Sequence, residues 1–116
     1  MTDSSLEARQ LAHYTAILSE AQQAATEATI KHISENPNQW YPCGFAWVLI
    51  KPARGGFVNY LKKREIGNTS YSGGYSVWNP SGHPTQWMDA KFEGATAFAK
   101  VLQKYGIKAY ADQRMD

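Results

Sequence analysis

The residues best suited to chemistry in this chain lie in a short basic turn that follows an apolar run. Lys51 and Arg54 supply positive charge, and Gly55 and Gly56 come directly before a helical pattern. Glycines at the start of a helix let backbone amides approach an anion, and an arginine beside them adds a bidentate donor. The turn lacks the spaced Gly-Lys-Ser/Thr of a phosphate loop. It therefore predicts anion binding without phosphate-loop chemistry.

Aromatic residues are the second feature that suggests a ligand. Several lie in loops or strands among Gly, Ser, Asn and Pro: Trp40, Tyr41, Tyr71, Tyr75, Trp78 and Trp87. Rings beside Lys51 and Arg54 could stack bases while the cations hold phosphates. The same residue types dominate protein interfaces, and any single ring could instead belong to the core. The predicted ligand-binding residues are Lys51, Arg54, Gly55, Gly56, Tyr71, Tyr75, Trp78 and Asn79.

The remaining polar residues form no pattern typical of catalysis or metal binding. Cys43 comes before an apolar run and fits a small buried residue better than a nucleophile. Asp89 and Glu93 lie one helical turn apart, and as acids at a helix start they favour the helix dipole. The histidines fall on separate predicted elements without metal-ligand spacing: His13, His32 and His83. We therefore expect no metal and no cofactor, and a binding protein rather than an enzyme.

Charge is unevenly distributed, although the net charge is only +2. Residues 1–36 hold two basic and five acidic residues, a net charge of −3, whereas residues 37–88 hold five basic and one acidic, a net charge of +4. A basic segment attracts phosphates or an acidic protein surface, although a solvated helix face gives the same count. The charge is modest for a protein that binds nucleic acid.

Composition limits the class of protein. The chain has 116 residues, 43% of them hydrophobic, which suits one domain with a buried core. It has no apolar run near the roughly 18 residues that span a bilayer, and residues 1–18 do not read as a charged-then-apolar leader. One cysteine cannot form an internal disulfide. We therefore expect a cytoplasmic protein that is neither exported nor membrane-bound.

Residues 1–36 predict one long helix. Ser4 and Glu7 form a capping-box pattern, and the segment up to Ile33 contains neither Gly nor Pro. Its apolar seam consists of Leu11, Tyr14, Leu18, Ala21, Ala25 and Ala28. A helix of this length approaches about 45 Å, so it either lies across its own core or joins another subunit in a homo-oligomer. The turn at residues 36–38 separates it from an α+β core domain of residues 37–116.

The core domain alternates strand and helix patterns. Residues 45–50 are apolar on both faces and predict a central strand, followed by a helix that ends at Gly67. Residues 71–78 predict a second strand in which Gly73-Gly74 forms either a bulge or a hairpin turn. A helix at residues 86–105 and a short strand at residues 107–111 complete the chain, leaving a tail from Gln113.

The hairpin alternative gives the β-α-β-β-α-β order of a ferredoxin-like fold, with both helices on one face of the sheet. The other face then needs a cover, since residues 45–50 are apolar on both sides. We expect either the N-terminal helix or the sheet of a second copy to supply it.

Several stretches resemble a group of small, uncharacterised proteins of tailed bacteriophages. They are WYPCGFAW at residues 40–47, GGY at 73–75, Gln86 with Lys91, and AFAKVL at 97–102. The resemblance covers residues 40–116 best. It implies a bacterial cytoplasmic setting and no particular activity, although small phage proteins often block a host protein or sequester a signalling nucleotide.

These observations favour a non-enzymatic phage accessory protein that binds a phosphate-bearing small molecule, such as a signalling nucleotide in counter-defence. We expect it to form a homo-oligomer. An inhibitor or adaptor that meets a host protein through its aromatic surface is the first alternative. A single-strand nucleic-acid binder is the second, and strong salt dependence of binding would favour it.

Overall fold

Helices and strands alternate along the part of the chain that the structure describes. The computed structural model describes residues 2–37, 42–70 and 73–115. The elements are α1 (Thr2–Glu35), β1 (Gly44–Ile50), α2 (Gly56–Lys63), β2 (Asn68–Thr69), β3 (Tyr75–Trp78), α3 (Met88–Lys104) and β4 (Ala109–Met115). The expected α+β class is confirmed. No helix within these described residues is long and apolar enough to cross a membrane.

The four strands form one antiparallel sheet in the order β2-β3-β1-β4. β1 is an inner strand, as its two apolar faces predict. Trp47 lies opposite Trp78 of β3, and Leu49 lies opposite Tyr110 of β4. β4 runs to residue 115 instead of ending at residue 111, so the predicted tail is wrong. The polar side chains at residues 112–114 hide this strand from sequence analysis, but their backbone completes the hydrogen-bonding edge of β1.

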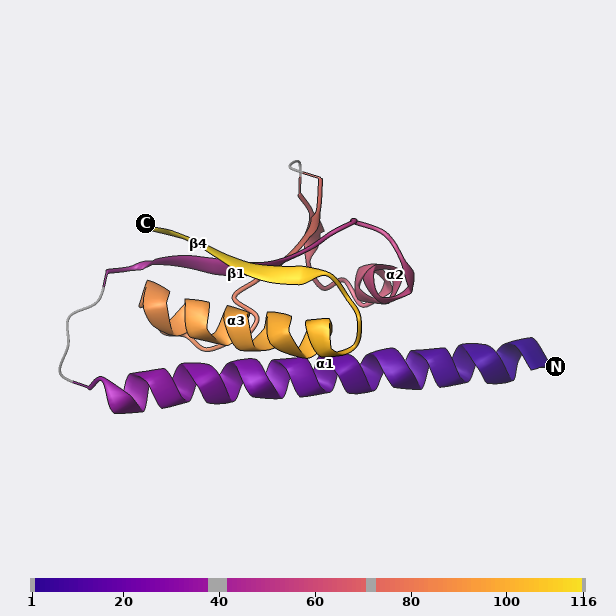
Figure 1. Ribbon diagram of the computed structural model, residues 1–116, viewed down its shortest axis with the longest axis horizontal. Helices are drawn as coiled ribbons and strands as arrows, with labels where there is room; N and C mark the ends of the chain where they lie inside the picture. Colours follow the sequence, from indigo (N-terminus) through magenta and orange to yellow (C-terminus); the bar gives the residue numbers. More distant parts are fainter. Residues whose placement is uncertain (1, 38–41, 71–72, 116) are drawn as a thin grey trace.

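α3 and α1 lie in successive layers on one side of the sheet (Figure 1). α3 packs along β1 and β4, and α1 packs along α3 on the side away from the sheet. The expectation that α1 covers the opposite face of the sheet is therefore wrong. The reason is that α3 has two packed sides: its apolar residues are buried against the sheet, and its small residues face α1.

Small side chains let α1 and α3 approach closely. A Cβ atom added at Gly94 would overlap the Thr29 hydroxyl and lie 3.1 Å from the Ala25 carbonyl oxygen. The Thr29 hydroxyl is buried and donates a hydrogen bond of 2.8 Å to the carbonyl of Ala90. The alanine-rich half of the predicted seam thus packs on the protein's own core.

The N-terminal part of α1 departs from the predicted seam. Ile17, Leu18 and Ala21 are buried, whereas Leu11 is 57% exposed and Leu6 is 55% exposed. Figure 1 shows these first turns of α1 extending past the end of α3. Leu11 therefore does not belong to the packed stripe, because α3 is too short to reach it.

The two glycines at residues 73 and 74 belong to the connection between β2 and β3, which pair antiparallel. The amide of Ser70 donates to the carbonyl of Gly74, and the amide of Gly73 donates to the carbonyl of Ser70. The hairpin alternative is therefore the observed one. The elements follow the β-α-β-β-α-β order, but α2 has only eight residues and lies beyond the end of β1 (Figure 1). The ferredoxin-like arrangement, with two helices along one face, is not confirmed.

Candidate functional site

The outer face of the sheet, opposite α3, carries no helix in the described chain. Ala46, Val48 and Ile50 of β1 point into the core, so alternation turns the residues between them outward. The register places outward residues of β3 and β4 beside them. We call this surface the sheet face; its members are Phe45, Trp47, Leu49, Ser76, Trp78, Tyr110, Asp112 and Arg114.

Aromatic rings form a row across the sheet face. The rings of Trp47 and Trp78 stack with centroids 4.8 Å apart and planes 27° apart. Phe45 meets Trp78 edge to face at 6.0 Å. Trp78 is 47% exposed, Tyr110 45% and Phe45 36%, so solvent reaches these rings. Rings that contact one another on neighbouring strands form a flat apolar platform, on which planar groups can stack.

Leu49 and Ser76 are buried members of the sheet face, each at 6% exposure. Gly74 approaches the leucine so closely that a Cβ atom on this glycine would lie 2.8 Å from Leu49 Cδ1. The β2–β3 connection therefore covers one end of the face, and the aromatic platform occupies the rest.

Cations surround the platform. The Arg114 guanidinium lies 5.6 Å from the centroid of the Phe45 ring, and Lys91 Nζ lies 5.4 Å from the same ring. Lys91 reaches this position from α3 and donates a hydrogen bond of 2.9 Å to the carbonyl of Gly44. Lys51 Nζ lies 5.9 Å from the Tyr110 ring. Asp112 is the single acid among the members of the sheet face, and its carboxylate accepts the amide proton of Gln113.

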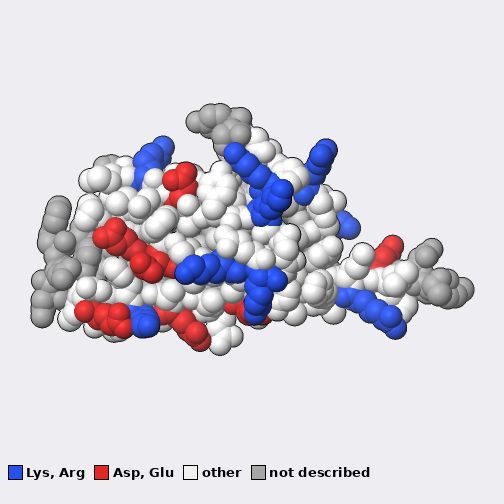
Figure 2. All heavy atoms as spheres, in the orientation of Figure 1, with Lys and Arg blue, Asp and Glu red and all other residues white. Residues whose placement is uncertain are grey.

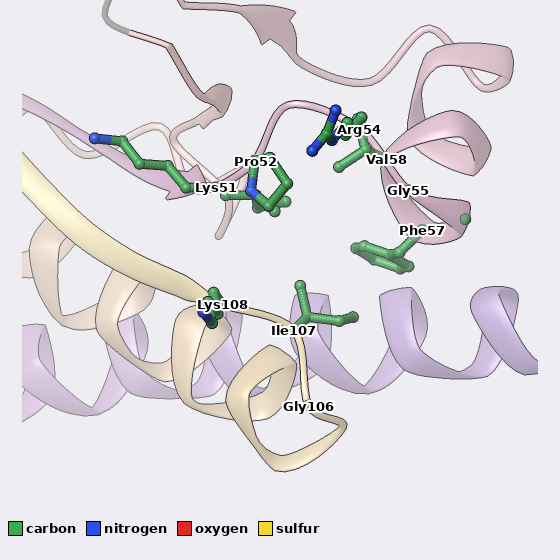
Figure 3. Close-up of a pocket in the computed structure, with 11 residues that line it drawn as sticks. Lys51, Pro52, Arg54, Gly55, Phe57, Val58, Gly106, Ile107 and Lys108 are labelled. Carbon is green, nitrogen blue, oxygen red and sulfur yellow. The ribbon is translucent and has the colours of Figure 1, made fainter.

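A second surface lies where β1 ends. Lys51, Arg54, Gly55 and Gly56, four of the predicted ligand residues, line one cavity of about 310 Å³. We call it the basic pocket; its full lining is Ile50, Lys51, Pro52, Arg54, Gly55, Gly56, Phe57, Val58, Gly106, Ile107 and Lys108. Phe57 and Ile107 project into the space between β4 and the turn before α2 (Figure 3). The lining contains no acidic residue.

The glycines of the basic turn have a structural explanation. Gly55 has a φ of 115°, a conformation that side chains disfavour. Gly56 packs against α1 so closely that a Cβ atom would overlap the Tyr14 hydroxyl. The backbone therefore requires glycine at position 55, and the close approach of Tyr14 favours it at position 56, so the chemistry of the pocket depends on its cations.

The other predicted ligand residues are dispersed. Tyr75 is 2% exposed and its hydroxyl donates to the carbonyl of Ile66, so its ring belongs to the core; burial raises its pKa above 10.0. Asn79 lies in a turn, where its side-chain amide donates to the carbonyl of His83. Trp78 lies on the sheet face. Tyr71 lies outside the described residues, as do Trp40 and Tyr41.

Cys43 is exposed, so the expectation of a buried thiol is wrong. It forms an isolated bridge with Trp87 just before β1, and its sulfur contacts the side chain of Gln86. The described residues contain no group of three or more His, Cys, Asp or Glu that could hold a metal ion.

Several side chains on or beside the sheet face were not among the predicted ligand residues, including Phe45, Trp47, Tyr110, Lys91 and Arg114. A strand pattern was present in β4, since Tyr110, Asp112 and Arg114 are spaced two apart and so lie on one face of a strand. No local pattern joins Lys91 of α3 to Phe45 of β1, because only the packing of α3 under the sheet brings them together.

Charge also separates the two ends of the molecule. Figure 2 shows acidic side chains gathered over the half that contains the C-terminal part of α1, while Lys and Arg predominate nearer α2. The basic pocket lies at this second end, beside the turn into α2.

Comparison of the chain with protein-family models, with curated proteins and with solved structures gave no match. Function is therefore inferred from the geometry of the sheet face and the basic pocket.

Proposed function

We propose that this protein is a non-enzymatic binder of single-stranded nucleic acid, and that the bases stack on the sheet face. The observation that supports this most strongly is the row of aromatic rings on two adjacent strands, with Lys91 and Arg114 beside it. In this row Phe45 and Trp78 are exposed and Trp47 is half-buried. Single-strand binders combine aromatic stacking platforms with cations that follow the backbone.

The energetics suit this ligand. Stacking of a base on an aromatic side chain contributes about 1–3 kcal/mol, and every base has a face that can stack. RNA-recognition domains likewise stack two or three bases on aromatic residues of a four-stranded sheet. That likeness concerns the arrangement of rings on a sheet and supports the proposal by analogy alone.

An extended ligand fits the placement of the residues better than a small one. The chain rises about 20 Å from Phe45 to Lys51, at roughly 3.4 Å per residue of strand. A mononucleotide held in the basic pocket would leave the aromatic row unused, whereas a strand of a few nucleotides can contact both surfaces. We therefore propose that the phosphate-bearing ligand is a strand of several nucleotides and not a single nucleotide.

Charge distinguishes nucleic acid from the other candidates for this face. A symmetric dimer formed through the sheet face would enclose the cations of both copies, with only Asp112 of each to pair them. An acidic host protein, the adaptor alternative, would satisfy the same cations and could use the rings as hot spots. Nucleic acid fits better, because each nucleotide carries both a flat ring that can stack and a phosphate that can pair with a cation.

The resemblance to tailed-phage proteins supplies the proposed setting. We propose a bacterial cytoplasm, in which single strands of RNA and DNA are both present. The two share phosphate and base chemistry, so a direct binding comparison of an RNA and a DNA oligonucleotide assigns the preference.

Fluorescence anisotropy with labelled oligonucleotides of about twelve nucleotides tests the proposal, since site sizes of roughly 4–16 nucleotides are usual for such platforms. We expect single strands to bind more tightly than a duplex of the same sequence. Replacing Trp78 or Phe45 by Thr should weaken binding about tenfold each, from the loss of one stacked base at about 1–3 kcal/mol. Thr keeps the β-propensity of the strand.

The matched control is Leu11→Ala, which removes an exposed apolar side chain far from the sheet. It should leave affinity unchanged. Absence of binding at low salt, or equal losses in the face variants and in the control, would contradict the proposal. Tight binding of an acidic protein domain that Trp78→Thr abolishes, with no oligonucleotide binding, would favour the adaptor alternative.

A further inference from the structure

The basic pocket adjoins the sheet face through one residue. Lys51 lines the pocket, yet in Figure 3 its side chain extends away from Arg54, and its ammonium lies 5.9 Å from the Tyr110 ring of the sheet face. We propose that the pocket binds the terminal phosphate of the strand whose bases stack on the sheet face. This inference rests on the proposed function.

Three segments far apart in sequence converge on the pocket. Lys51 follows β1, Arg54 lies in the turn before α2, and Lys108 comes just before β4. The amide of Lys51 donates a hydrogen bond of 3.1 Å to the carbonyl of Lys108, which holds two of these segments together. The backbone at Lys51 and Lys108 is therefore held in place by the fold itself.

The cations of the pocket are available to an anion. No acidic residue lines the cavity, and within the described ranges none of Lys51, Arg54 and Lys108 forms an ion pair. The Arg54 side chain lies over Pro52 at the mouth of the cavity (Figure 3). A guanidinium in this position can donate two parallel hydrogen bonds to a phosphate.

A terminal phosphate suits this site better than an internal one. A phosphate monoester carries a charge of about −1.5 to −2 at pH 7, with a second pKa near 6, whereas an internal diester carries a single charge. Arg54 and Lys108 line the pocket without an acid, and this favours the more highly charged group. Its extra oxygen also offers more acceptors to Arg54 and Lys108. The pocket would thereby place one end of the strand beside the sheet face.

The experiment compares three oligonucleotides of about eight thymidines, with internal labels, that carry a 5′-phosphate, a 3′-phosphate or hydroxyls at both ends. We expect one of the phosphorylated strands to bind roughly tenfold more tightly than the hydroxyl strand at pH 7.5, and the preference to shrink below about pH 6 as the phosphate gains a proton. Inorganic phosphate should weaken binding of that strand selectively.

Arg54→Ala should abolish the preference, measured for each variant as the ratio of its affinity for the phosphorylated strand to its affinity for the hydroxyl strand. Lys108→Gln provides a second, independent variant, and Lys63→Ala, which removes a cation of α2 outside the pocket lining, is the control that should keep the preference. Equal affinity for all three strands, or a preference that survives in both pocket variants, would overturn the inference while the proposed function stands. Failure of every oligonucleotide to bind would overturn both.

Discussion

The two faces of β1 show how one apolar strand serves two purposes. Its inward residues, Ala46, Val48 and Ile50, are small or aliphatic and at most 2% exposed, and they pack against α3. Its outward residues Phe45 and Trp47 carry large rings that no described helix covers. Exposed apolar surface of this kind usually marks an interaction site. The inner face therefore stabilises the fold, and the outer face is free to bind.

The largest expected effect is on the free energy of unfolding, which should depend much more on the inner face than on the outer face. Phe98 of α3 is 1% exposed, so Phe98→Ala should lower the free energy of unfolding by about 3–5 kcal/mol, through lost burial and the cavity left behind. Trp78→Thr, on the outer face, should cost less than about 1.5 kcal/mol, since much of its ring is already exposed. Urea denaturation measures both. Equal losses would show that the outer row is part of the core, and would remove the contrast.

A smaller effect is expected on the salt dependence of binding, which tests the role of the cations beside the outer face. Arg114→Gln should reduce the slope of log affinity against log salt by about 0.7, the contribution of one phosphate contact on a single strand. Lys100→Gln removes an exposed cation from α3, away from the sheet face, and should leave the slope unaltered. Anisotropy titrations at several salt concentrations give these slopes. An identical change in both variants would mean that only net charge matters.

The smallest expected effect concerns the contact between α1 and the end of α3. Glu20 accepts hydrogen bonds from Lys104 and Tyr105, which hold its pKa below 4.5. The same contacts raise the pKa of Lys104 and of Tyr105. A carboxyl with a lowered pKa stabilises the fold above its unfolded pKa, and this contribution disappears as pH falls through the folded pKa.

Glu20→Gln should therefore lower the thermal midpoint slightly at pH 7. The difference from the unaltered protein should shrink as the pH falls below the unfolded pKa of about 4.3 and vanish below the folded pKa. The effect is small because all three side chains are exposed to solvent. Oligonucleotide affinity should not change, since Glu20 is remote from the sheet face. A difference that persists at low pH would point to packing in place of charge.

Periodicity alone was sufficient for much of the architecture. The 3.6-residue pattern predicted α1 and α3, and the Pro and Gly residues between them predicted most of the ends of the elements. The apolar run at residues 45–50 correctly predicted an inner strand. Polar residues concealed the end of β4, because backbone pairing with β1 decides that strand and side-chain hydrophobicity does not.

Only part of the candidate site could be predicted from the sequence. Four of the predicted residues around Arg54 line one cavity. Tyr75 could not be distinguished from Trp78 by composition, although one is in the core and the other on the sheet face. Adjacent positions in a strand face opposite ways, so the assignment depends on which side α3 occupies.

The sequence by itself determined the α+β class, the long α1 helix and a middle segment rich in cations, because these depend on local periodicity and composition. Only the tertiary structure decided that α1 packs on α3, so that no described helix covers the outer face of the sheet. It also decided that Lys91, Arg114 and Phe45 meet there. Such contacts join distant segments, and they arise from the packing of small residues at the α1–α3 interface and from strand register, which no local pattern encodes.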